Sequence, residues 1–219
     1  MKIVVLTTIV NSTASNLLKE AGEKRGHTVE IWNLNEMYLY ISNVHRKDRL
    51  FHKEERVYKK DIDAVITRIG TSKYGRSIIT HMRQNMGIYT CQTVAGIDNA
   101  ADKWKTNQLL SIKGIKTPRA VYAKETINPE FLINLVGGLP VIVKGLSGSQ
   151  GANVIILETI LSANSVLESY YKNKQQVLIQ EYIEPDESGA KDIRAIVIGG
   201  KVITAMQRIA PKGSFKSNV

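Results

Sequence analysis

The sequence predicts an α/β fold, with a parallel sheet formed by the first 95 residues. Short β-branched runs alternate there with helical patterns, each of which stops before a glycine. The strands are Lys2–Thr8, Thr28–Trp32 and Asp63–Ile69, and the helices are Ser15–Arg25 and Tyr74–Met86. Strand–helix alternation is typical of parallel sheets, because each crossover needs a helix-length connection. The composition agrees, since 219 residues with 43% hydrophobic and 23% charged side chains suit an ordinary globular protein.

The second half of the chain also alternates, and it ends in a hairpin. Residues 96–118 predict a connecting helix that begins at Asp98 or Asn99 and ends at Gly114. We expect strands at Ala120–Ala123, Pro140–Lys144, Asn153–Leu157 and Gln176–Tyr182, and helices at Pro129–Leu135 and Ser162–Lys172. Residues 192–198 and 201–208 predict a hairpin with Gly199-Gly200 as its turn. Domain boundaries are therefore expected at 1–95, 96–187 and 188–219.

Composition narrows the class of protein and of partner. No apolar run approaches the roughly 20 residues of a membrane span, no signal-peptide cleavage pattern follows the first residues, and Cys91 is the only cysteine. These features favour a cytoplasmic protein without a membrane partner. The net charge of +10 attracts anions. Part of it lies between Arg46 and Lys60, which is either a solvated surface hairpin or a docking face for an acidic or ribosomal partner. The low aromatic content of 6% and the lack of a nucleic-acid motif argue against a specific nucleic-acid partner.

Residues 140–151 carry the pattern most indicative of a ligand. An apolar strand ends in Lys144, and the loop Ser147-Gly148-Ser149-Gln150-Gly151 leads into the next apolar strand. Small residues let backbone N–H groups approach phosphate oxygens, and an ammonium group neutralises their charge. The chain has neither a Walker A pattern nor G-x-G-x-x-G after its first strand, so a strand–loop–strand polyphosphate site is predicted. The alternative is a strand-end lysine that reaches into solvent beside an ordinary turn.

Further short phrases occur in a specific order along the whole chain. They are Asp63-Ala64-Val65-Ile66-Thr67-Arg68-Ile69-Gly70, Asp102-Lys103, Val136-Gly137-Gly138-Leu139-Pro140, Gln180-Glu181-Tyr182-Ile183, Asp192-Ile193-Arg194 and Phe215-Lys216-Ser217-Asn218. Their order and spacing resemble the RimK family of ATP-grasp ligases, which adds glutamate to the C-terminus of a ribosomal protein. The resemblance implies an ATP-grasp fold that follows an N-terminal pre-ATP-grasp α/β domain.

The resemblance also implies residues that contact the ATP phosphates. Lys103 and Lys144 would offset the phosphate charge, and the Ser147–Gly151 loop would close over the β- and γ-phosphates. Lys216, Ser217 and Asn218 match a trio that reaches the phosphates from the far side. The family usually has arginine at the first of these positions, and lysine keeps the charge but loses the planar fork.

Other matching positions imply contacts with the base and the substrates. Glu181 would accept a hydrogen bond from the adenine amino group, with the backbone of Tyr182 and Ile183 beside it, and Asp192 would contact the nucleotide. Three arginines match substrate positions: Arg194 and Arg208 as anchors for the acyl-phosphate or the incoming amino acid, and Arg68 for a substrate carboxylate. Surface charges at strand ends are the alternative for these residues.

The magnesium ligands of the family belong to a late acidic residue and a Glu-x-Asn strand, and the sequence contains no E-x-N. We therefore expect the C-terminal sheet to be incomplete and its hairpin to leave an apolar face uncovered, which favours a homo-oligomer. The expected function is an ATP-dependent carboxylate–amine ligase that uses Mg²⁺ and adds an amino acid, such as glutamate, to an acidic peptide or a ribosomal protein. The alternative is a nucleotide-binding or ribosome-docking module without the metal ligands.

Overall fold

The computed structural model describes residues 1–42, 49–125, 128–145, 154–185 and 189–211. The chain divides into two compact units, Met1–Asp102 and Lys103–Val219, and each is described by itself. In the described ranges, no helix is long and apolar enough to cross a membrane.

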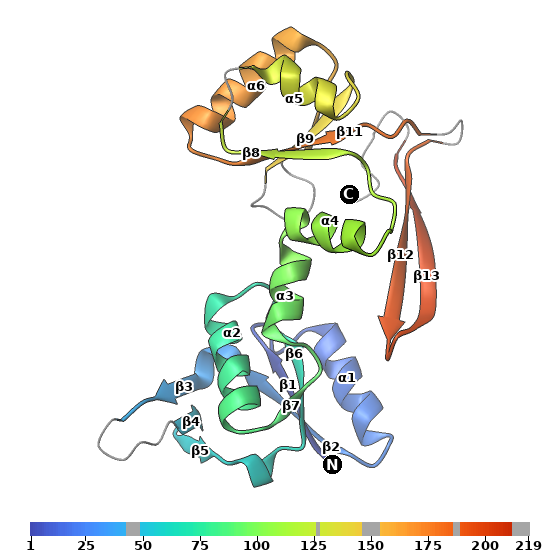
Figure 1. The fold of residues 1–219 in the computed structure, drawn as a ribbon. Coiled ribbons are helices and arrows are strands. Elements are labelled where there is room, and N and C mark those ends of the chain that lie inside the picture. Colours follow the sequence, from blue (N-terminus) through green and yellow to red (C-terminus); the bar gives the residue numbers. More distant parts are fainter. Residues whose placement is uncertain (43–48, 126–127, 146–153, 186–188, 212–219) are drawn as a thin grey trace. The chain divides into compact units, whose positions relative to one another are not determined.

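The first unit is built on a parallel sheet, as the sequence predicts. Its four strands lie in the order β2-β1-β6-β7, with β1 at Lys2–Thr7, β2 at Thr28–Asn33, β6 at Ala64–Arg68 and β7 at Tyr89–Thr90 (Figure 1). Helix α1 (Thr13–Glu23) begins at Ser12, and α2 (Lys73–Thr80) begins at Ser72, and each serine side chain accepts a backbone N–H of the first turn. A π-helical segment, η3 (His81–Asn85), continues α2. The strand β7 was not predicted, since two residues are too few for a periodic signal.

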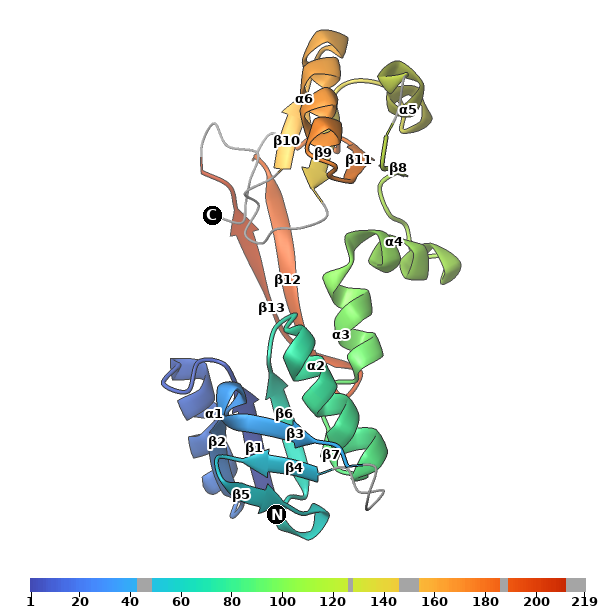
Figure 2. The ribbon, with the colours of Figure 1, turned by 90° about the vertical axis from the view of Figure 1, so that its left-hand side faces the viewer.

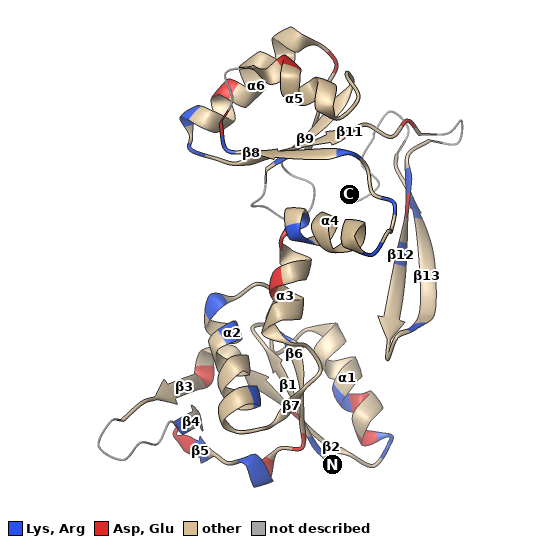
Figure 3. Ribbon diagram, viewed as in Figure 1, with Lys and Arg blue, Asp and Glu red and all other residues tan. Residues whose placement is uncertain are grey.

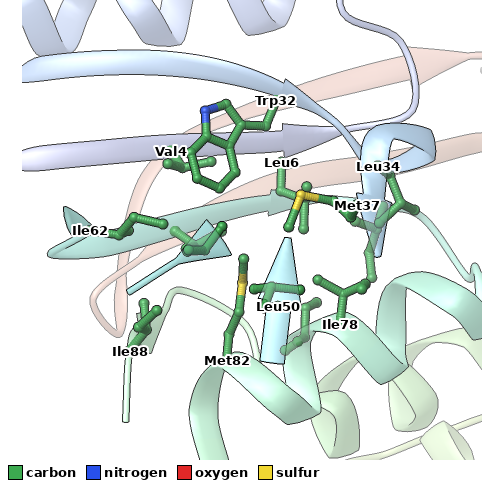
Figure 4. Close-up of a cluster of buried hydrophobic side chains, with 14 of the residues drawn as sticks. Val4, Leu6, Trp32, Leu34, Met37, Leu50, Ile62, Ile78, Met82 and Ile88 are labelled. Atoms are coloured by element: carbon green, nitrogen blue, oxygen red, sulfur yellow. The ribbon is translucent and has the colours of Figure 1, made fainter. Parts of the chain in front are cut away.

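The core of the first unit lies between the sheet and α2. Val4 and Leu6 of β1 are fully buried there in one cluster with Ile78 and Met82, and Figure 4 shows the cluster, with Val4 beside Trp32. Helix α1 packs on the opposite face, where Gly22 approaches Val29 so closely that an added Cβ would lie 2.5 Å from its Cγ2. Val4, Val5 and Leu6 in succession are buried, and this burial on both faces of the sheet explains the continuous apolar run of β1.

A small antiparallel sheet is the main element of this unit that the sequence did not predict in full. Its order is β3-β4-β5, with β3 at Met37–Tyr40, β4 at Arg49–His52 and β5 at Glu55–Val57, between the 3-10 turns η1 (Leu34–Glu36) and η2 (Lys59–Asp61) (Figure 2). The predicted surface hairpin corresponds to β4 and β5, and Lys53 in its turn has a φ of 56°. Leu50 and Val57 are buried in the main core, so one face of this sheet is structural.

The predicted connecting helix is instead two helices. They are α3 (Val94–Ala101) and α4 (Lys103–Ile112), and Asp102 between them has an extended backbone with φ −97° and ψ 110°. The prediction of Asp98 or Asn99 as the N-cap was wrong, because the hydroxyl of Thr93 accepts from the backbone N–H of Gly96 at 3.0 Å and starts α3 one turn earlier. Gly114 follows the end of α4 with a φ of 69°.

The second unit contains an antiparallel sheet in the order β10-β9-β11-β8. Its strands are β8 (Ala120–Ala123), β9 (Val141–Gly145), β10 (Val154–Leu157) and β11 (Val177–Glu181). Helices α5 (Pro129–Leu135) and α6 (Ile160–Lys172) cover one face (Figures 1 and 2). Buried Ile133 and Leu167 from these helices pack against Val143 and Ile179.

The predicted C-terminal hairpin is also confirmed. It consists of β12 (Lys191–Ile198) and β13 (Lys201–Ile209), and Gly199 and Gly200 supply its turn with φ values of 57° and 77°. Apolar side chains such as Ile193 and Ile203 are exposed on it, with 73% and 61% of their surface accessible. Within the described ranges, no third strand pairs with the hairpin.

Candidate nucleotide site

A cleft of about 640 Å³ in the second unit brings several predicted site residues together. It is lined by residues of β9, by the end of β11 and by the start of β12. The lining includes five of the predicted nucleotide contacts, namely Lys144, Glu181, Tyr182, Ile183 and Asp192. Ile142, Val154 and Pro118 add apolar surface. Apolar walls with a few convergent polar groups are the usual character of a small-molecule site.

Lys144 supplies a constrained positive charge to this cleft. Its side chain is half-buried, and Nζ donates a hydrogen bond of 2.5 Å to Oε1 of Gln180. Burial lowers the pKa of Lys144, and the positive charge of nearby Lys103 lowers it further. The structure therefore places the two predicted phosphate contacts close enough to repel each other. An anion bound beside them would offset both effects.

Glu181 is held by a residue that the sequence analysis missed. Its Oε1 accepts from Nη2 of Arg119 at 2.9 Å, and its Oε2 accepts from Nε at 3.1 Å and from the backbone N–H at 3.0 Å. The backbone N–H of Glu181 donates in turn to the Arg119 carbonyl at 2.9 Å. The Arg119 side-chain and backbone hydrogen bonds lower the pKa of Glu181 to about 2. The expected contact of Glu181 with the adenine amino group stays a prediction, and a base would meet a carboxylate whose two oxygens already accept hydrogen bonds.

Gly137 makes room for this arginine. A Cβ at Gly137 would lie 2.3 Å from Nη2 and 2.6 Å from Cζ of Arg119, and its φ of +105° is also unfavourable for other residues. The Val136-Gly137-Gly138 phrase thus has a local structural reason. It is the one sequence signal that could have pointed to Arg119, although nothing in the sequence shows which side chain fills the space.

Asp192 and Arg208, both predicted site residues, form an ion pair with each other. They are directly opposite in the hairpin register, and Nε of Arg208 donates to Oδ1 of Asp192 at 2.6 Å, with a second contact between Nη2 and Oδ2. The hydrogen bonds that Arg208 donates to the Asp192 carboxylate raise the pKa of Arg208. Arg194 shares this face of the hairpin, opposite Met206, and its side chain is exposed. Asp192 lines the cleft, whereas neither arginine is among its lining residues.

The remaining predicted residues lie elsewhere. Arg68 ends β6 in the first unit and lines a separate hollow of about 430 Å³ with Thr71 and Gln92, at the carboxyl end of the parallel strands. Ligands commonly bind at that end of such a sheet. Ser147, Gly148, Ser149, Gln150 and Gly151, with Lys216, Ser217 and Asn218, lie outside the described residues.

Comparison with known proteins gives the family. The model of the RimK PreATP-grasp domain matches residues 1–97, and the model of the RimK-like ATP-grasp domain matches residues 100–219. The chain belongs to the RimK family of ATP-grasp proteins. Similar curated RimK relatives are the probable alpha-L-glutamate ligases of Psychromonas ingrahamii, 39% identical, and Methanococcoides burtonii, 38% identical. Each match covers 100% of this chain and 71% of the relative.

Solved structures show the same fold at low sequence identity. The RimK domain ATP-grasp protein of Sphaerobacter thermophilus is 20% identical with a TM-score of 0.69, and the match covers 95% of this chain and 73% of that one. The D-alanyl-alanine synthetase A of Vibrio cholerae is 16% identical with a TM-score of 0.65, over 99% and 69% of the two chains. The predicted α/β, ATP-grasp fold is thereby confirmed.

ATP and Mg²⁺ are the cofactors typical of ATP-grasp ligases, and the described residues fit only one of them. The half-buried Lys144, which the charge of Lys103 repels, and the apolar cleft fit a nucleotide polyphosphate. Across the described ranges, no group of three or more His, Cys, Asp or Glu side chains is arranged to hold a metal ion. We therefore assign no step to a metal.

Proposed function

We propose that the cleft of the second unit binds ATP. The single observation that carries this proposal is the lowered pKa of Lys144, caused by burial and by Lys103, at the wall of an apolar cleft. The phosphates would lie beside these two lysines. The adenine would lie against the segment Glu181–Ile183, where the backbone of Tyr182 and Ile183 offers hydrogen-bonding groups.

We further propose that the protein is a carboxylate–amine ligase that adds glutamate. The curated relatives, named probable alpha-L-glutamate ligases, support this choice of amino acid. An acceptor carboxylate, such as the C-terminus of a ribosomal protein, would attack the γ-phosphorus of ATP and release ADP. The amine of glutamate would then attack the acyl-phosphate carbon, phosphate would leave, and an amide bond would form.

Three arginines are proposed to hold the substrates. Arg68 would bind a substrate carboxylate at the hollow in the first unit, and Arg194 would approach the acyl-phosphate or the incoming amino acid. Arg208 would act through Asp192, because its guanidinium is already occupied by that carboxylate. The loop Ser147–Gly151 and the trio Lys216–Asn218 are proposed as further phosphate contacts. The proposed domain limits stay at 1–95, 96–187 and 188–219.

Calorimetric titration of ATP with magnesium into the purified chain tests the nucleotide site. We expect saturable binding that weakens about 10- to 150-fold in Lys144→Ala, since hydrogen bonds to charged groups contribute about 1.5–3 kcal/mol. Lys113→Ala, an exposed lysine beyond the end of α4, is the matched control and should bind like the unmodified chain. The proposal is contradicted if the unmodified chain does not bind ATP, or if Lys144→Ala and Lys113→Ala lose equal ATP affinity.

A ligase assay separates catalysis from binding. Incubation with ATP, glutamate and a peptide with an acidic C-terminus should yield ADP, phosphate and the glutamyl peptide in equal amounts. The second candidate, a nucleotide-binding or ribosome-docking module, is favoured by the net charge of +10. ATP binding without amide formation would support that module and refute ligation by this chain.

A further inference from the structure

The small antiparallel sheet of the first unit presents aromatic and basic side chains on one face. Residues directly opposite in an antiparallel register share a face, and the face alternates along each strand. Tyr38 is opposite Phe51, Phe51 is opposite Arg56, and Tyr40 is opposite Arg49. Tyr58 follows Arg56 at the same spacing. We call these six residues the tyrosine–arginine face: Tyr38, Tyr40, Arg49, Phe51, Arg56 and Tyr58.

This face is not needed to fill the core. The opposite face carries Leu50 and Val57, which are buried against the parallel sheet. On the tyrosine–arginine face, by contrast, Tyr38, Tyr40 and Tyr58 expose 53%, 48% and 46% of their surface. Three large aromatic rings are therefore available to a partner without disturbing the fold.

The arginines lie against the rings, and no carboxylate of the described residues pairs with them. The guanidinium carbon of Arg49 is 5.8 Å from the centroid of Tyr40, and that of Arg56 is 4.8 Å from the centroid of Tyr58. Lys60 adds its ammonium at 5.8 Å from the same Tyr58 ring. In the part of the chain that the structure describes, neither Arg49 nor Arg56 forms an ion pair, whereas Arg119 and Arg208 each hold a carboxylate.

The surrounding charge is also positive. The described residues 49–60 contain five Lys or Arg, two Glu and no Asp. Figure 3 shows basic positions on β5 and on the turn that follows it. A partner for this face should therefore combine negative charge with flat groups that stack on tyrosine.

We propose that the tyrosine–arginine face binds single-stranded RNA without sequence preference. Unstacked bases would lie on the exposed rings, and the arginines would contact the phosphates between them, as in other single-strand sites on sheets. An acidic peptide would use the arginines but would leave the tyrosines without a role. The tyrosine hydroxyls can also hydrogen-bond the 2′-hydroxyl groups that distinguish RNA from DNA. This surface lies wholly in the first unit and does not depend on the ATP cleft.

Fluorescence anisotropy with a short labelled oligouridine tests the proposal on the full chain. Oligouridine contains no adenine, so an adenine site in the second unit should not capture it, and Lys144→Ala should bind it unchanged. Tyr40→Ala should weaken binding roughly 5- to 150-fold, the range for loss of one base–aromatic stack. Tyr40→Phe, which keeps the ring, should retain most of the affinity. The matched control is Tyr89→Ala, an exposed tyrosine of the same unit that should have no effect.

Salt dependence tests the arginines separately. The slope of log affinity against log salt should fall in magnitude by about 0.7 in Arg56→Ala, as expected for one phosphate contact on a single strand. Arg25→Ala, an exposed arginine beyond α1, should leave the slope unchanged. Far-UV circular dichroism of each variant shows whether it is folded.

Three results would overturn binding of a single strand at this face, and a fourth would refute the preference for RNA. One is no measurable oligouridine binding at low salt. Another is an equal loss of oligouridine affinity in Tyr40→Ala and Tyr89→Ala. The third is binding of polyglutamate that competes with oligouridine and is insensitive to Tyr40→Ala, which would assign the face to acidic polypeptides. Equal affinity for oligothymidine with a deoxyribose backbone would refute the preference for RNA.

Discussion

Replacing Gly137 by alanine should displace the Arg119 guanidinium and release Glu181. The new Cβ would lie 2.3 Å from Nη2 and 2.8 Å from Nη1 of Arg119. Ordinary contact begins at 3.4 Å, so the guanidinium has to move by about 1 Å. Its hydrogen bonds to Glu181, at 2.9 and 3.1 Å, leave little room for that movement.

Gly138→Ala is the matched control for backbone strain. Gly138 has a φ of +90°, close to the +105° of Gly137, but an added Cβ would have no atom within 4 Å. Both substitutions should therefore destabilise the fold by about 1–3 kcal/mol through the strained backbone alone. Only Gly137→Ala should also disturb the ion pair.

The pKa of Glu181 is the readout, followed by NMR of the side-chain carboxyl carbon against pH. The unmodified chain and Gly138→Ala should show a pKa of about 2, whereas Gly137→Ala and Arg119→Ala should show values shifted back toward 4.5. Because the folded-state pKa is depressed, the Arg119 contact stabilises the fold above pH 4.5, and this stabilisation is lost as the pH falls from 4.5 toward 2. Arg119→Ala should lose less stability over that interval. A pKa that stays near 2 in Gly137→Ala refutes the argument from the close contact.

Two other substitutions test the lysine site and a helix cap. Lys144→Met should raise the thermal midpoint at neutral pH, because it removes a positive charge whose pKa is lowered by burial and by Lys103. The unmodified chain should gain stability as the pH rises from the lowered pKa toward 10.5, because the unfolded chain binds more protons than the folded chain in that interval. Thermal denaturation at several pH values should show this gain in the unmodified chain and not in Lys144→Met. Thr93→Ala should lower the free energy of unfolding by about 0.5–2 kcal/mol in urea denaturation through loss of the N-cap of α3, whereas Thr93→Ser should keep most of it. A destabilised Lys144→Met, or equal effects of the two Thr93 variants, would contradict these explanations.

Much of the fold could be predicted because its elements carry local signals. The strand Ala120–Ala123 and the helix Pro129–Leu135 have the predicted bounds, and Gly199-Gly200 is the predicted turn. The small sheet could not be predicted in full, since β3 is short and its pairing with β4 depends on contacts distant in sequence. One helix was predicted where the structure has two, α3 and α4. The break was missed because no local sequence signal marks the extended backbone of Asp102.

Several residues that the resemblance implied for the site line one cleft, but their pairing could not be predicted. Lys144, Glu181 and Asp192 line one cleft, as their order in the sequence suggested. That Glu181 is held by Arg119, and Asp192 by Arg208, depends on register across strands and on the space left at Gly137. Sequence reasoning assigns a charge to a position, and only the fold shows which charge is already compensated.

This pairing determines the electrostatic character of the cleft. The carboxylates of Glu181 and Asp192, which line the cleft together with that of Glu184, would repel a polyphosphate if their charges were uncompensated. Glu181 and Asp192 each have an arginine on them instead, so these two pairs contribute little net charge. Lys144 and Lys103, in contrast, repel each other, and this repulsion lowers the pKa of Lys144. The cleft therefore has two arginine-paired carboxylates and a Lys144 whose pKa the charge of Lys103 lowers, and a polyphosphate beside the lysines would offset their repulsion without competing for the arginines.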